Sequence, residues 1–140
     1  MRVVVDSNVL VAALRSPSGI NRDVILACAR RRAFPLVGEK LFLEYESILG
    51  RAPLFQGSPL SSRERQEFLD AFLSLCEWVS VSYLWRPNLP DEGDNHVVEL
   101  AVAGGAQAIV TANTRDFQRG ELRFPGIDLL TPRQSIERII

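Results

Sequence analysis

Four acidic residues occupy positions at which the sequence pattern favours a shared site: Asp6, Glu44, Asp94 and Asp116. A group of carboxylates without a histidine or cysteine cluster suits Mg²⁺ or Mn²⁺, which prefer hard oxygen ligands. Like charges held together repel and raise one another's pKa, and a divalent cation neutralises them. A carboxylate-bound metal activates water and polarises a phosphodiester. These residues therefore indicate metal-dependent phosphodiester hydrolysis.

Asp6 follows an unbroken β-branched run, Val3, Val4 and Val5. Such a run is typical of a strand buried on both faces, as in a parallel sheet. Asp6 then lies at the carboxyl end of a central strand, where open α/β sheets place their ligand sites. Ser7 or Asn8 is the expected cap of the helix that follows. The alternative is that Asp6 is only a polar residue at the end of a strand.

Glu44 lies within a helix expected from residue 39 to about residue 51. The buried face of this helix carries Leu41, Tyr45 and Ile48, and Glu44 falls on the same stripe. A carboxylate on an apolar stripe is costly unless it is paired or binds a metal. The alternative is a boundary position whose carboxylate reaches water.

Asp94 precedes a helix whose inner stripe begins with Val97 and Val98. Acidic residues are common in a first turn, because they interact favourably with the helix dipole. Asp94 stands one turn before the apolar stripe, and we expect it to project toward the core-facing edge. The only histidine, His96, forms neither a triad nor a metal cluster by itself, and we expect it on the surface or in a groove.

The last candidate region follows a buried run at residues 106–111 that predicts another strand. This strand ends on Asn113 and Asp116, a second set of polar residues at a strand end. If the strands are parallel, their carboxyl ends meet at one edge of the sheet. Asp6 and Asp116 then reach that edge from strands, and Glu44 and Asp94 reach it from helices.

The alternation of strands and helices predicts the architecture that positions these residues. Apolar runs predict about five strands, and amphipathic segments separate them. A mostly parallel sheet in a three-layer α/β/α sandwich is the expected fold, in a single domain over residues 1–140. The expected strands cover residues 2–5, 34–37, 78–82, 106–111 and 126–130.

Composition narrows the class of protein further. The net charge is −1, which argues against a protein that wraps duplex nucleic acid but permits a local contact patch. Cys28 and Cys76 lie in apolar helical patterns without metal-binding spacing, so we expect reduced, packed thiols and a cytoplasmic location. No apolar run approaches the length of a membrane span, so we expect no transmembrane helix. The first residues lack the pattern of a signal peptide, so we expect none.

Four segments of the chain, taken in order, resemble the motifs of the PIN-domain family. Residues 5–11 (VDSNVLV) resemble the opening motif, and residues 42–49 (FLEYESIL) resemble the second. Residues 91–94 (DEGD) resemble the third, and residues 109–117 (IVTANTRDF) resemble the fourth. Each motif alone is weak, but all four occur in order, at family spacing, across nearly the whole chain. The sequence is therefore similar to PIN domains of the VapC-type toxin ribonucleases of toxin–antitoxin systems.

This resemblance implies a site and an activity. It makes Asp6, Glu44 and Asp94 ligands of Mg²⁺ or Mn²⁺, assisted by Asp116. The implied function is endoribonuclease cleavage of single-stranded RNA, as the toxin of a toxin–antitoxin pair. The implied partners are an RNA substrate, a cognate antitoxin protein and a second copy of the chain in a homodimer.

The remaining polar residues of the motifs are expected to orient ligands or water. They are Ser7, Asn8, Thr111 and Asn113. The common fourth motif carries Asp where Asn113 stands, so the site loses one charge that Asp116 is in a position to replace. Ser7 stands for the more usual Thr and keeps the hydroxyl. The Asn113 substitution leaves one alternative, a degenerate PIN domain that binds RNA or a partner protein without cleavage.

Two other classes of protein also cluster Asp residues at strand ends. Haloacid-dehalogenase-type phosphotransferases need a second Asp two residues after the first, where this chain has Asn8. Response-regulator receiver domains need a late Lys, and the only lysine is Lys40. No glycine-rich phosphate loop is present, which argues against a nucleotide cofactor.

Overall fold

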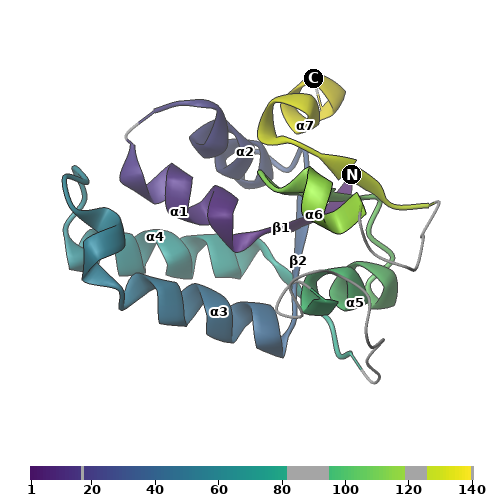
Figure 1. Ribbon diagram of the computed structural model, residues 1–140, viewed down its shortest axis with the longest axis horizontal. Coiled ribbons are helices and arrows are strands. Elements are labelled where there is room, and N and C mark those ends of the chain that lie inside the picture. Colours follow the sequence, from purple (N-terminus) through teal and green to yellow (C-terminus); the bar gives the residue numbers. More distant parts are fainter. Residues whose placement is uncertain (17, 82–94, 119–125, 140) are drawn as a thin grey trace.

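A computed structural model describes residues 1–16, 18–81, 95–118 and 126–139 (Figure 1). Five parallel strands form one sheet in the order β3-β2-β1-β4-β5. The strands are β1 (Arg2–Val5), β2 (Phe34–Val37), β3 (Glu77–Trp78), β4 (Ala108–Val110) and β5 (Asp128–Leu130). The prediction of a mostly parallel, five-stranded α/β fold is confirmed, and every strand pair is parallel.

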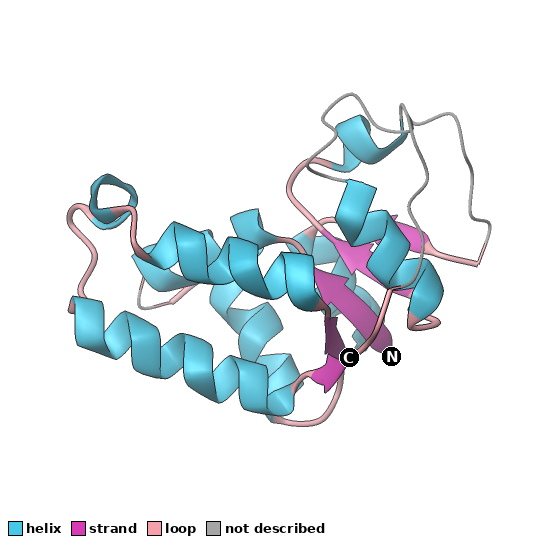
Figure 2. Ribbon diagram, turned by 90° about the horizontal axis from the view of Figure 1, so that it is seen from below, coloured by secondary structure: helices cyan, strands magenta, loops and turns pink. Residues whose placement is uncertain are grey.

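Helices separate these strands along the chain and surround the sheet (Figure 2). They are α1 (Ser7–Arg15), α2 (Ile20–Ala29), α3 (Glu39–Leu49), α4 (Ser62–Leu75), α5 (Asn95–Ala103), α6 (Thr114–Gln118) and α7 (Pro132–Ile139). A short 3-10 helix, Ala52–Phe55, lies between α3 and α4. Helix α4 begins with the capping box of Ser61 and Glu64, whose side chains each bond the other residue's backbone N–H.

The central position of β1 explains its uninterrupted valine run. β1 pairs with β2 on one side and with β4 on the other, so both of its edges are hydrogen-bonded. Helix α5 packs against β1, β2 and β4 (Figure 1). The helices α1 and α2 pack against each other. Val3, Val4 and Val5 are all buried. A strand covered on both faces needs apolar residues at every position rather than at alternate ones.

The third strand is shorter than the sequence predicts. Residues 78–82 alternate in polarity, but β3 consists only of Glu77 and Trp78, which pair with Leu36 and Val37. β3 is an edge strand with both residues exposed, and short edges limit unwanted pairing with other chains. Val79 continues the strand direction by one hydrogen bond, from its N–H to the carbonyl of Val37.

Both cysteines are free thiols, Cys28 buried and Cys76 partly buried. Burial raises the pKa of each thiol to about 12. Protonated, packed thiols are poor nucleophiles, so these residues serve packing rather than chemistry. This agrees with the packed state that the sequence predicts for them.

The described helices include none that is long and apolar enough to cross a membrane.

Two adjacent glycines end helix α5 for different reasons. A Cβ on Gly104 would approach the Cδ1 atom of Leu36 to 2.6 Å, so this position requires close contact between the helix and the sheet. Gly105 has φ +65°, the left-handed conformation that commonly terminates helices. The N–H of Ala106 then donates to the carbonyl of Ala101. The pair fixes where α5 stops and β4 can begin.

We predict that Gly105→Ala lowers the free energy of unfolding by about 1–2 kcal/mol, because an L side chain is strained at this positive φ. Urea unfolding followed by circular dichroism measures the change. The matched control is Gly126→Ala, since no atom lies within 4 Å of a Cβ there and the backbone is not left-handed. Equal effects of both substitutions would contradict the conformational explanation.

Candidate metal centre

Asp6 lies where the chain direction across the sheet reverses. β1 is followed by β2 on one side, and the later strands β4 and β5 lie on the other side. In open α/β sheets, ligands bind at this switch point, outside the carboxyl ends of the strands. The N–H of Asp6 donates to the carbonyl of Val110 at 2.9 Å, so Asp6 directly continues the β1–β4 ladder.

Asp6 is also the N-cap of helix α1. Its Oδ1 accepts a hydrogen bond of 2.8 Å from the N–H of Ser7, the first helical residue. The prediction that Ser7 or Asn8 caps this helix is therefore wrong. The helix begins immediately after the strand, so the carboxylate at the strand end takes the capping position itself.

Three side chains at the switch point form a connected hydrogen-bond network. The Thr111 hydroxyl donates to Asp6 Oδ2 at 2.8 Å, and Asn8 Nδ2 lies 3.2 Å from both Asp6 Oδ2 and Thr111 Oγ1. Asn8 Oδ1 accepts the N–H of Ala112 at 3.2 Å. The N–H of Asn113 donates to Thr111 Oγ1 at 3.0 Å, while Asn113 is itself exposed. This network joins β1 to the residues that follow β4.

Burial makes Asp6 unfavourable as a charged group. The residue is only 4% exposed, and burial raises its pKa above the ordinary value. The hydrogen bonds from Thr111 and Ser7 oppose this effect, and the negative charge of Glu44 adds to it. Asp6 forms no ion pair among the described residues. A cation bound beside Asp6 would favour its ionised form.

Glu44 reaches the same site from helix α3. The Ser7 hydroxyl donates to Glu44 Oε1 at 3.0 Å, so one residue links both carboxylates. His96 of α5 places its Nε2 atom 2.8 Å from Glu44 Oε2. Burial raises the pKa of Glu44, but the bond and charge of His96 and the bond from Ser7 outweigh it, so the net shift is downward. The buried stripe of α3 thus carries a carboxylate that is paired rather than directed only to water.

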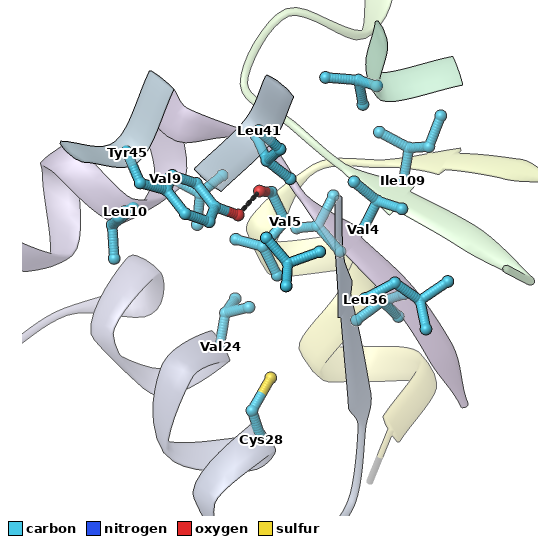
Figure 3. Packing of buried hydrophobic residues seen from close by; sticks show 14 of the residues in the cluster. Val4, Val5, Val9, Leu10, Val24, Cys28, Leu36, Leu41, Tyr45 and Ile109 are labelled. Atoms are coloured by element: carbon cyan, nitrogen blue, oxygen red, sulfur yellow. Dashed lines mark hydrogen bonds between the residues drawn. The ribbon is translucent and has the colours of Figure 1, made fainter. Parts of the chain in front are cut away.

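Tyr45, the next residue of α3, fixes the position of Glu44 relative to β1. Its side chain is fully buried, and its hydroxyl donates a hydrogen bond to the carbonyl of Val5 (Figure 3). The Tyr45 ring also packs edge-on against Phe72 of α4 at 6.0 Å between centroids. Val5 immediately precedes Asp6, so this bond couples the two elements that supply the carboxylates.

The other two predicted ligands fall outside what the structure describes. Asp94 belongs to the segment 82–94, which lies outside the described residues, and Asp116 lies in α6 with a side chain that is not described. Within the described part of the chain, no group of three or more His, Cys, Asp or Glu side chains is arranged to hold a metal. The four-carboxylate ligand set therefore stays a prediction, of which Asp6 and Glu44 are seen together.

The structure brings His96 of α5 to the site, which sequence reasoning did not assign there, and buries Glu99 on the same helix. His96 contacts Glu44, although its isolated position in the sequence gave no indication of a role. Glu99 follows one turn later and is 2% exposed. Its signal in the sequence was a carboxylate between Val98 and Leu100 on a mostly apolar helix, the same signal that identified Glu44.

The donors present fit a hard divalent cation. Carboxylate oxygens from Asp6 and Glu44 approach one site from different elements, and neutral hydroxyl and amide groups hold the Asp6 carboxylate in place. Burial raises the pKa of Asp6, and a metal ion bound beside it would favour the ionised carboxylate. Oxygen ligands of this kind favour Mg²⁺ or Mn²⁺ over softer metals.

Comparison with known proteins identifies the family. Residues 2–115 match the family model described as PIN domain. This match spans most of the chain, and the chain belongs to the PIN-domain family. The family resemblance inferred from the four motifs is thereby confirmed.

A solved structure has the same fold. A chain of the crystal structure described as VapBC2 from Rickettsia felis, bound to a DNA fragment from their promoter, superimposes with a TM-score of 0.63. The similarity covers 94% of this chain and 98% of that chain, at 16% sequence identity. No match was found among curated proteins. At this identity, the likeness shows a shared fold.

We predict that Tyr45→Phe lowers the free energy of unfolding by about 1 kcal/mol, because it removes the buried hydrogen bond to Val5 and keeps the packed ring. The urea midpoint falls while the m value stays constant. Tyr45→Leu, which also loses the contact with Phe72, should destabilise the fold more. A Tyr45→Phe protein as stable as the wild type would show that this bond does not hold α3 to β1.

A second prediction concerns Asp6 in the metal-free protein. The pKa of Asp6 is raised in the folded state, so its contribution to stability is present when the carboxyl is neutral and is lost as pH rises through the folded pKa. Asp6→Asn carries no such charge. The free energy of unfolding of Asp6→Asn in EDTA, relative to wild type, should therefore increase from about pH 4 to about pH 8.

Chemical denaturation at several pH values measures this difference. Asp128→Asn, at an exposed carboxylate of β5, is the control and should show no such increase. If the difference in free energy of unfolding between Asp6→Asn and wild type stays constant with pH, then the ionisation of Asp6 does not lower the stability of the fold.

Proposed function

We propose that this protein is a Mg²⁺- or Mn²⁺-dependent endoribonuclease that cleaves single-stranded RNA. The observation that supports the proposal most directly is the buried, hydrogen-bonded Asp6 carboxylate linked through Ser7 to Glu44 at the switch point of the sheet. Membership of the PIN-domain family, whose domains are generally nucleases, points to the same chemistry.

The residues proposed to hold the metal are Asp6, Glu44, Asp94 and Asp116. When bound there, a divalent ion supplies activation of water and charge stabilisation at the scissile phosphate. The protein positions its ligands: Thr111 and Asn8 fix the Asp6 carboxylate, and Ser7 fixes Glu44. Such hydrogen bonds orient the metal ligands. Loss of one typically changes metal affinity or activity by about 10- to 100-fold.

The cellular role that we propose is that of a toxin with a cognate antitoxin protein. The four motifs resemble those of VapC-type toxin ribonucleases, and the fold is similar to a chain of the promoter-bound VapBC2 structure. We also infer a homodimer, as the family resemblance implies, and a cytoplasmic location, which agrees with two free, packed cysteines. The two carboxylates of Asp6 and Glu44 suit an antitoxin that supplies a basic side chain.

Cleavage of a labelled panel of single-stranded RNAs tests the nuclease proposal. The expected result is cutting by the wild type with Mg²⁺ or Mn²⁺ and none with EDTA. Asp6→Asn and Glu44→Gln should each lower kcat/KM by about 100-fold or more, because each removes a charge that holds the metal at the reacting phosphate.

Glu46→Gln is the matched control, since it removes a carboxylate from the same helix two residues from Glu44 and should leave the rate unchanged. Metal binding is measured separately as an increase in melting temperature. A ligand at 100 times its Kd stabilises the folded state by about 2.7 kcal/mol. An inactive wild type that still binds RNA or a partner protein would favour the degenerate PIN domain instead.

A further inference from the structure

A cavity of about 390 Å³ opens beside the acidic pair, Asp6 and Glu44. Its walls come from the start of α3, from β3 and the residues after it, and from α5. The residues that line these walls include Lys40, Trp78, Ser80, His96 and Glu99. Its volume lies at the lower end of the range for ligand sites, about 300–1,000 Å³, which suits a single nucleotide better than a longer ligand.

His96 connects this cavity to the candidate metal centre. Its imidazole lines the cavity, and its Nε2 lies 2.8 Å from Glu44 Oε2. His96 Nδ1 is buried and has no hydrogen-bond partner within the described part of the chain. Because Nε2 faces Glu44, Nδ1 is the ring nitrogen left to face a ligand. A ligand in the cavity that carries a hydrogen-bonding group can pair with it.

Trp78 is the most unusual residue of the cavity wall. Its side chain is 55% exposed, although large aromatic side chains usually contribute more to stability when they are buried. Its ring is held by Phe42 of α3, with 5.3 Å between the ring centroids and a tilt of 54° between the planes. The ring of Trp78 is thus supported by packing on Phe42 and remains accessible to solvent. That is how proteins present a ring to an unstacked base of single-stranded RNA.

The charges of the cavity indicate which part of a nucleotide enters it. Glu39 lines the cavity, and its carboxylate repels a phosphate group. A neutral base is therefore a better occupant of the interior than a phosphate. Lys40, the only lysine of the chain, also lines the cavity and is exposed at the start of α3, where it is placed to meet the phosphate backbone of a bound nucleotide.

We propose that this cavity is a base-binding subsite, in which one base of single-stranded RNA stacks on Trp78 next to the phosphate held at Asp6 and Glu44. The assignment rests on the proposed nuclease function and adds the position of the substrate. The base and ribose supply hydrogen-bonding groups, such as a 2′-hydroxyl, for His96 Nδ1. Stacking is tolerant of sequence, so the subsite contributes binding energy for any base that fits.

Cleavage kinetics of three variants test the subsite. Trp78→Leu should raise KM for single-stranded RNA about 5- to 150-fold, the range that corresponds to loss of one base-stacking interaction. Trp78→Phe keeps an aromatic face and should restore most of the affinity. Phe34→Leu is the matched control, because Phe34 is also a well-exposed aromatic residue but lies at the start of β2 and is absent from this cavity's walls. All three variants should keep the melting shift produced by Mn²⁺.

Fluorescence measures binding without cleavage. Trp85→Phe leaves Trp78 as the only tryptophan, and a short single-stranded RNA titrated in EDTA should quench its emission. Quenching with a wild type that fails to cleave RNA would overturn the nuclease proposal but support the base-binding subsite. Cleavage that is unaffected by Trp78→Leu, together with no quenching, would overturn the subsite and leave the nuclease proposal intact.

Discussion

The arrangement of the site depends on one constraint, the burial of a carboxylate at the end of the central strand. Asp6 is 4% exposed, continues the β1–β4 ladder through its N–H, and caps α1 through its side chain. Burial of a charge without compensation is costly, so the surroundings supply donors from Ser7, Asn8 and Thr111. These donors hold Asp6 in one geometry but add no positive charge. The fold therefore holds a buried carboxylate in one geometry, and a cation bound beside it would favour its ionised form.

Helix α3 extends the same logic to the second carboxylate. Its buried stripe anchors the helix through Tyr45, whose hydroxyl bonds the backbone one residue before Asp6. Glu44 is thereby held close to Asp6, and Ser7 and His96 bond its two oxygens. The pKa of Asp6 is raised mainly by its burial, whereas the pKa of Glu44 is lowered because the contacts of His96 and Ser7 outweigh the effect of burial. The two carboxylates, which are linked through Ser7, thus differ in how readily they ionise.

Much of this arrangement could be predicted from the sequence, because it depends on local patterns. The valine run at 3–5 predicts a doubly covered central strand, and the polar residues directly after it predict a site at the sheet edge. Glu44 could be found because it breaks an apolar stripe. His96 could not, since its role depends on α5 passing α3, a tertiary contact with no periodicity of its own. The cap of α1 and the short β3 were also missed, because element boundaries depend on backbone geometry at single residues.

His96 connects the cavity with the two carboxylates, Asp6 and Glu44. Its ring has two nitrogens, and the structure uses Nε2 on the side of Glu44 while Nδ1 remains for the cavity. A nucleotide bound at Trp78 and a metal held at Asp6 and Glu44 would therefore meet through the same residue. Because the chain as a whole carries a net charge of −1, long-range attraction does little to hold RNA. Affinity must then come from short-range contacts, and the exposed ring of Trp78, which packs on Phe42, offers one such contact.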